Sequence, residues 1–146
     1  MTKKPKKPDD TELDDITRGI VVLRDKCCIW CGSIKILNAS HIKPKGRNKS
    51  MRWDLDNVIL LCWHCHFSKA HKDPLAFADF IRSKFGQTKY DELTLRANTP
   101  NPSIDRFDIK RRLLEAKEKG DYYAQVCIRP LIDDDGFNPS ISELGS

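Results

Sequence analysis

The amino-acid sequence predicts an α+β protein with a compact strand, strand, helix unit and flanking α-helices. Apolar and polar residues alternate over residues 34–42, as is typical of a strand, and residues 58–61 form a short apolar run that fits a second strand. From Cys65 onward the apolar spacing becomes helical. One Cys-x-x-Cys pair precedes the first strand and another follows the second, so we expect this unit to be the centre of the fold.

The length of the chain allows one compact domain with appended segments, since domains commonly contain about 100–150 residues. We expect a disordered basic arm at residues 1–10, a core with an N-terminal helix at 11–86, a helical extension at 87–120 and a tail of uncertain structure at 121–146. The oligomeric state is left open.

The composition excludes a membrane protein, because no apolar run approaches the roughly 20 residues that a membrane span needs. The positive charge at the start of the chain is not followed by an apolar stretch, so we expect no secretory signal. A cytoplasmic protein meets a reducing compartment, where Cys-x-x-Cys pairs bind metal more often than they form disulfides.

The first helix is predicted at residues 11–25, capped by Asp9, Asp10 or Thr11. Leu13, Ile16, Ile20 and Leu23 lie at helical spacing, and we expect this helix to pack on the core. We place Asp14 and Asp15 in the first turn, where they favour the helix dipole, and do not interpret them as metal ligands.

Two helices are predicted after the second cysteine pair. Asp73 and Pro74 form the N-cap and first turn of the earlier helix, which Gly86 ends. Thr88 and Asp91 have capping-box spacing at the start of the next helix, which runs to residue 97.

A last helix is predicted from a Ser103 cap to Lys119, with Gly120 as its stop. Beyond it, residues 122–132 can form an edge strand, and Cys127 is expected to be an unreactive free thiol.

The two cysteine pairs predict a structural Zn²⁺ site. Two residues between paired ligands let a tight turn aim both sulfurs at one ion, and four thiolates complete a tetrahedron. The ligands are Cys28, Cys31, Cys62 and Cys65. Cys27 competes for the first position, but the two-residue spacing favours Cys28, so we expect Cys27 to be a buried bystander.

Four further residues in and after this unit are not needed by a four-cysteine site: His41, Asn57, His66 and His71. They include the residue types that handle hydrolytic water and a divalent cation. The sequence therefore predicts a catalytic site beside the zinc site, with His64 in a structural role.

Positive charge is concentrated beside these residues, although the net charge of +5 is moderate. No acidic residue occurs from Lys26 through Trp53. Such a field is expected where phosphates approach, and DNA is the predicted partner. The predicted phosphate contacts are Lys43, Lys45, Arg47, Lys49 and Arg52.

Several motifs resemble those of the HNH endonucleases, in the branch with a four-cysteine zinc knuckle. The three namesake residues are matched by His41 in Ser-His-Ile-Lys-Pro, Asn57 in Leu-Asp-Asn-Val-Ile-Leu-Leu-Cys and His66 in Cys-x-x-Cys-His-x-x-x-Ala-His. The likeness covers roughly residues 28–71, under a third of the chain. Residues 52–57, 65–74 and 90–93 are similar to segments of phage and prophage HNH proteins. A weaker likeness, in the C-terminal part, is to phage Rap-type recombination nucleases, which cut branched DNA.

The resemblance implies a ββα-metal (His-Me finger) core and a metal-dependent endonuclease that hydrolyses phosphodiester bonds of DNA. His41 would be the general base that activates water, because an imidazole can accept a proton near neutral pH. Asn57 would orient that base through backbone contacts or contribute to metal binding. His66 would bind the catalytic divalent ion, Mg²⁺ or another.

Two positions depart from the family pattern. Many relatives have Asp or His as a metal ligand immediately before the base, where this chain has Ser40. His71 follows His66 by five residues, whereas residues four apart share a helical face. His71 can therefore share the ion only if the helix loosens or ends near Ala70; otherwise it contacts a phosphate.

Two alternative functions remain open at this point. A four-cysteine module with a basic loop can be a non-catalytic zinc DNA-binding module, and a nuclease of this type can be specific for branched DNA. We expect Trp30, Trp53 and Trp63 to pack around the zinc knuckle and not to stack on bases.

Overall fold

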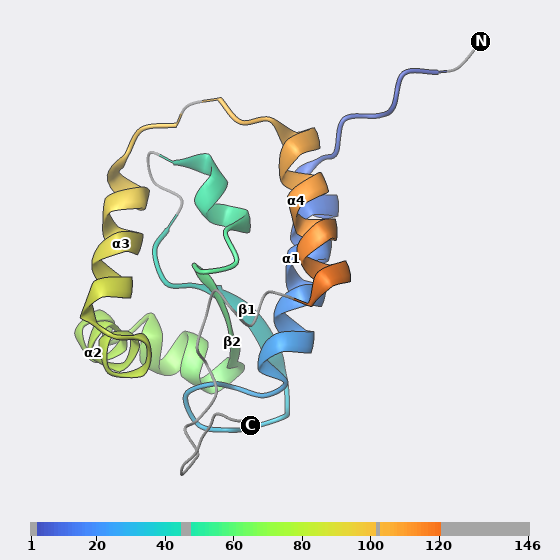
Figure 1. Cartoon of the computed structure of the whole chain (residues 1–146). Helices are drawn as coiled ribbons and strands as arrows, with labels where there is room; N and C mark the ends of the chain where they lie inside the picture. Colours follow the sequence, from blue (N-terminus) through green and yellow to red (C-terminus); the bar gives the residue numbers. More distant parts are fainter. Residues whose placement is uncertain (1–2, 45–47, 102, 121–146) are drawn as a thin grey trace.

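The computed structural model describes residues 3–44, 48–101 and 103–120 and confirms the α+β class (Figure 1). The elements in chain order are α1 (Asp10–Asp25), β1 (Leu37–His41), the 3₁₀-helix η1 (Lys49–Trp53), β2 (Val58–Cys62), the π-helix η2 (His64–Ala70), α2 (Pro74–Phe85), α3 (Gln87–Asn98) and α4 (Arg106–Lys119). The strand, strand, helix order of β1, β2 and η2 is the predicted one.

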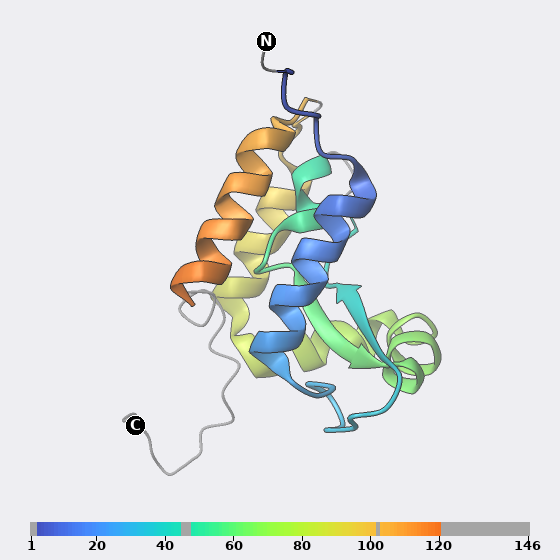
Figure 2. The ribbon, with the colours of Figure 1, turned by 90° about the vertical axis from the view of Figure 1, so that its right-hand side faces the viewer.

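The two strands form an antiparallel hairpin in which His41 pairs with Val58 and Leu37 with Cys62. All five residues of β2 are buried, because both faces of the hairpin are covered. Val58 and Leu60 pack in a cluster with α1 and α4, whereas Ile59 and Leu61 pack with α2 and α3. Figures 1 and 2 show α1 and α4 side by side on one face of the strands.

Helix α1 begins at Asp10, and the carboxylate of its N-cap Asp9 accepts a hydrogen bond from the Glu12 backbone N–H at 2.9 Å. One of the three predicted caps is thus confirmed. Of the four apolar residues at helical spacing, Leu23 is 49% exposed. The buried face turns instead through Leu13, Thr17, Ile20, Val21 and Arg24.

A buried ion pair at the end of α1 binds the outer edge of β2. Arg24 Nε lies 2.7 Å from Asp25 Oδ1, and both side chains are fully buried. Arg24 donates to the carbonyls of Leu55 and Val58 at 2.7 and 2.6 Å, and Asp25 accepts from Leu60 N at 2.9 Å. The bonds to Val58 and Leu60 satisfy edge groups of β2 that β1 does not reach, and the bond to Leu55 holds the segment before the strand.

Strand β1 is shorter than predicted, since it starts at Leu37 and not at residue 34. Ile36 has a positive φ of 49°, which breaks the extended run, and the side chains of Ile34 and Ile36 are exposed. The predicted end of the strand at His41 is confirmed.

The helix ends were predicted with mixed success. Asp73 caps α2 by accepting from Ala76 N at 3.0 Å, as predicted. The predicted capping box of α3 was wrong, because Gly86 is the N-cap and Asp91 accepts instead from the Gln87 side chain. The cap of α4 is Asp105 and not Ser103, since Asp105 accepts from the backbone N–H of residue 108.

The tryptophans were only partly predicted. Trp30 stacks on Phe80, with ring centroids 4.7 Å apart, and both pack against the buried cluster that contains Cys28, Cys62 and Cys65. Trp53 is buried in the other cluster, beside α1 and α4. Trp63 lies between the ligands of the second cysteine pair and the rest of η2; it is 53% exposed and its ring contacts Phe67.

The proposed division into arm, core and extension remains a prediction, although Pro8 of the arm is fully buried. The predicted edge strand at 122–132 and Cys127 lie outside the described residues, as do Lys45 and Arg47. Within the described ranges, no helix is both long and apolar enough to cross a membrane.

Candidate active site

The structure brings the four predicted cysteines together. The Sγ atoms of Cys28, Cys31, Cys62 and Cys65 all lie within 4.8 Å of one another, which suits one tetrahedral Zn²⁺. No other group of three or more His, Cys, Asp or Glu side chains converges in this way among the residues that the structure describes. Cys27 lies outside the cluster, as predicted for a bystander, but it is half-buried and not buried.

Backbone groups prepare this cluster for a metal. The N–H of Cys31 lies 3.5 Å from Cys28 Sγ, and the N–H of Cys65 lies 3.4 Å from Cys62 Sγ. Burial of Cys28 opposes its ionisation, but backbone N–H donors outweigh that cost and lower its pKa to about 7. Burial raises the pKa of Cys65, so a metal is needed to bring all four groups into the thiolate form.

Helix η2 places His66 and His71 on one face. The His71 N–H donates to the His66 carbonyl at 3.1 Å, a hydrogen bond across five residues and therefore the wide turn of a π-helix. The two ring centroids lie 4.6 Å apart. The helix is thus loosened between these residues, as sharing of an ion requires. His64 is exposed and does not line the pocket that contains His66 and His71.

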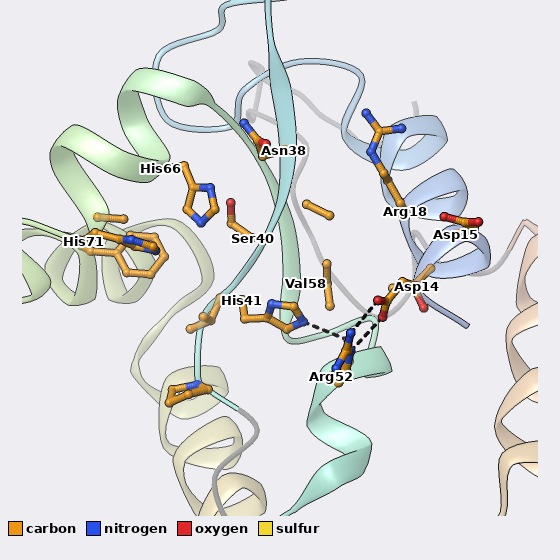
Figure 3. Close-up of a pocket in the computed structure, with 16 residues that line it drawn as sticks. Asp14, Asp15, Arg18, Asn38, Ser40, His41, Arg52, Val58, His66 and His71 are labelled. Carbon is orange, nitrogen blue, oxygen red and sulfur yellow. Dashed lines mark hydrogen bonds and ion pairs between the residues drawn. The ribbon is translucent and has the colours of Figure 1, made fainter. Parts of the chain in front are cut away.

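His66 has the properties of a neutral ligand. Its Nδ1 atom is buried and has no hydrogen-bond partner. Burial lowers its pKa, and the charges of His71 and His41 lower it further. Ser40 Oγ is also buried without a hydrogen-bond partner, and in Figure 3 Ser40 lies between His66 and His41.

His41 is held at the end of β1 by a backbone carbonyl. Its Nε2 lies 2.9 Å from the carbonyl oxygen of Arg52. A carbonyl oxygen can only accept a hydrogen bond, so Nε2 carries the proton in the neutral ring. Nδ1 is then the atom left to take a proton, and the ring is exposed.

Asn57 is fully buried and bonds only to backbone. Its Oδ1 accepts from Lys43 N at 2.8 Å, and its Nδ2 donates to the carbonyls of Lys43 and Met51 at 2.8 and 3.0 Å. Its own carbonyl accepts from Ile42 N at 2.8 Å. The side chain therefore joins the segment after His41 to η1.

These groups line one pocket of about 710 Å³ (Figure 3). Three histidines lie there, namely His41, His66 and His71, together with Ser40. Asn57 and the cysteines are not in the pocket lining and act behind it.

Helix α1 supplies pocket residues that the sequence interpretation missed: Asp14, Asp15 and Arg18. Because the helix begins at Asp10, the two acids lie beyond the first turn, contrary to prediction. The spacing of four between Asp14 and Arg18 signals a shared face. Nothing in the sequence shows that this face meets the histidines.

The basic side chains are arranged less uniformly than their sequence pattern suggested. Arg52 donates to both carboxylate oxygens of Asp14, at 2.7 and 2.9 Å. Lys43 Nζ lies 2.9 Å from the Tyr90 hydroxyl and 4.2 Å from the centre of its ring. Lys49 is exposed.

Comparison with known families identifies the segment that holds most of this site. Residues 27–68 match the family model described as HNH endonuclease. Comparisons with curated proteins and with solved structures give no match. The matched segment includes all four cysteines, His41, Asn57 and His66, whereas α1 and His71 lie outside it.

Proposed function

From the HNH endonuclease match at residues 27–68, we propose that this chain is a metal-dependent endonuclease that hydrolyses phosphodiester bonds of DNA. The observation that supports it best is the joint placement of His41, His66 and His71 in one pocket. A non-catalytic zinc module needs the cysteine cluster but has no use for three histidines that share a cavity.

His41 is the proposed general base. Since Nε2 donates to the Arg52 carbonyl, Nδ1 is free to take the proton of an attacking water. Asn57 keeps the segment after His41 against η1, which provides that carbonyl, and so maintains the orientation of the ring. We therefore assign Asn57 a positioning role and not a metal-binding one.

His66 and His71 are the proposed ligands of the catalytic ion, with Ser40 beside them. The unpartnered Nδ1 of His66 and the short separation of the two rings fit a metal ligand pair. When bound, a divalent ion neutralises charge on the phosphate and stabilises the departing 3′ oxygen. Imidazole suits Ni²⁺ or Zn²⁺ better than Mg²⁺ or Mn²⁺, which prefer oxygen ligands.

The cysteine cluster is proposed to bind a structural Zn²⁺, which would join the segment before β1 to the end of β2. Thiols that bind metal remain reduced in the cytoplasm, which is the proposed location.

The substrate phosphates are expected along the basic side of the pocket. Arg18 lines the pocket from α1, whereas Lys43 and Lys49 follow β1 and do not line it. Arg18 makes no ion pair within the described part of the chain and only one long hydrogen bond, 3.5 Å, to the Leu37 carbonyl. Its guanidinium is therefore available to a phosphate, whereas that of Arg52 is paired with Asp14.

The test is to incubate purified protein with supercoiled plasmid, linear duplex and a four-way junction, in Mg²⁺, Mn²⁺, Ni²⁺ or Zn²⁺. We expect ion-dependent cleavage that His66→Ala abolishes and the matched control His64→Ala retains. Cleavage of the junction alone would narrow the substrate to branched DNA. If no DNA is cut in any of the four ions, the chain is not a nuclease.

A further inference from the structure

The carboxylate of Asp14 binds two consecutive side chains of η1. Its Oδ1 accepts from Arg52 Nε at 2.9 Å and from Trp53 Nε1 at 2.8 Å, and its Oδ2 accepts from Arg52 Nη2 at 2.7 Å. The Arg52 guanidinium, followed by the Trp53 indole, holds the pKa of Asp14 below its usual value, so Asp14 is charged at neutral pH.

The peptide between these two side chains provides the carbonyl that orients His41. That carbonyl belongs to Arg52, and its oxygen lies 2.9 Å from His41 Nε2. Asp14 therefore binds the side chains of both residues that flank this peptide bond, and His41 is hydrogen-bonded to the carbonyl of the same peptide. Figure 3 shows the sequence of contacts from Asp14 through Arg52 to His41.

The segment depends on such anchors because η1 is only five residues long. A 3₁₀-helix of this length has weak internal hydrogen bonds. Its other attachments include the Asn57 bond to the Met51 carbonyl, the Asn48 cap, an ion pair between Arg52 and Asp10 at 3.5 Å and the burial of the Trp53 ring. In the described part of the chain, Asp14 is the residue that accepts hydrogen bonds from the side chains of both residue 52 and residue 53.

We propose that Asp14 is a positioning residue for His41, acting through Arg52 and Trp53. This positioning role rests on the proposed nuclease function. Helix α1 lies outside the HNH match, and the role makes it part of the active site. In this role Asp14 acts through the Arg52 and Trp53 side chains, which donate to its two oxygens. Arg52, interpreted from sequence as a phosphate contact, becomes part of the support of the base.

A double-mutant cycle separates this role from simple stabilisation of the fold. Asp14→Asn retains the shape of the side chain but loses its charge and one acceptor. We expect it to slow single-turnover plasmid cleavage by about ten- to a hundredfold, the effect of a misplaced catalytic group. In a His41→Ala background the same change should leave the residual rate within about twofold, because the group it positions is gone.

The matched control is Asp79→Asn, which breaks an exposed helical pair with Arg82 at 2.6 Å and should leave the rate unchanged. Arg52→Lys provides a second variant. It retains the positive charge for DNA but loses the two-point contact, so it should slow cleavage with little change in DNA affinity. Equal slowing by Asp14→Asn in both backgrounds, or loss of DNA affinity alone in Arg52→Lys, would overturn the proposal.

A readout independent of cleavage is the tautomer of His41, followed by ¹⁵N NMR of the histidine rings. Wild-type protein should show the Nε2–H tautomer, and Asp14→Asn should show a mixture of tautomers. An unchanged His41 spectrum in Asp14→Asn would refute the positioning role even if the protein cut no DNA. Absence of cleavage with the expected spectra would refute the nuclease function alone.

Discussion

The amide of Asn57 is a single buried side chain that holds two segments of backbone together. Replacing it with alanine would leave Lys43 N and the carbonyls of Lys43 and Met51 without their partners. We therefore expect Asn57→Ala to lower the free energy of unfolding by at least about 2 kcal/mol, measured by urea denaturation. The exposed Asn98→Ala should change it by less than about 0.5 kcal/mol, and similar values for both would contradict this account.

His66 gives the fold a pH dependence of known sign. Burial, and then the charges of His71 and His41, place its folded pKa below the ordinary 6.5, so the unfolded chain binds the proton more readily. Stability contributed by neutral His66 is therefore fully present above about pH 6.5 and is lost as pH falls toward the lower folded value.

The measurement is urea denaturation of wild type and His66→Phe between pH 5 and 7.5. Acid also weakens thiolate binding of metal, but that effect is common to both proteins. The wild type should lose more stability than the variant as pH falls below about 6.5. If the free energy of unfolding of the two proteins changed with pH in parallel, protonation of His66 would not destabilise the folded state.

At the scale of elements, the cysteine cluster is expected to decide whether the hairpin forms. A structural Zn²⁺ can contribute about 10 kcal/mol or more to folding. Cys62→Ser should lose one tightly bound zinc per chain, measured by metal analysis, together with the near-ultraviolet circular dichroism signal. Cys27→Ser, outside the cluster, should retain both. A folded, zinc-free preparation of the wild type or of Cys62→Ser would contradict this role.

The segment between β1 and η1 is expected to contact DNA phosphates. If Lys43 and Lys49 each contact one, replacing both with alanine should reduce the slope of log affinity against log salt by about two units. The control changes Lys117 and Lys119, exposed on α4, and should leave the slope as it is. An unchanged slope when Lys43 and Lys49 are replaced would show that DNA binds to another surface.

Helix η2 illustrates what spacing alone can predict. The five-residue separation of His66 and His71 shows from sequence that a regular α-helix cannot present both to one ion. It does not show whether the helix ends or widens, because that depends on how Cys65 and Ala70 are packed. The observed π-helix is the widened alternative.

For the whole molecule, the sequence predicted the features that depend on residues close together in the chain. The cysteine pairs, β2 and the start of α2 follow from residue spacing and caps within a few positions. The contribution of α1 could not be predicted, because it depends on which helical face meets β2. Arg24 and Asp25 show the same limit, since a charged pair normally indicates surface but here both side chains are fully buried against β2.

The central claim is that His41 is the base of an ion-dependent nuclease, and its most direct test combines cleavage with ion titration in His41→Ala. We predict that plasmid hydrolysis falls by roughly a hundredfold or more, whereas calorimetric affinity for the divalent ion and DNA binding remain close to wild type. Loss of ion binding in that variant would make His41 a ligand and not the base. Full cleavage by His41→Ala would contradict the mechanism altogether.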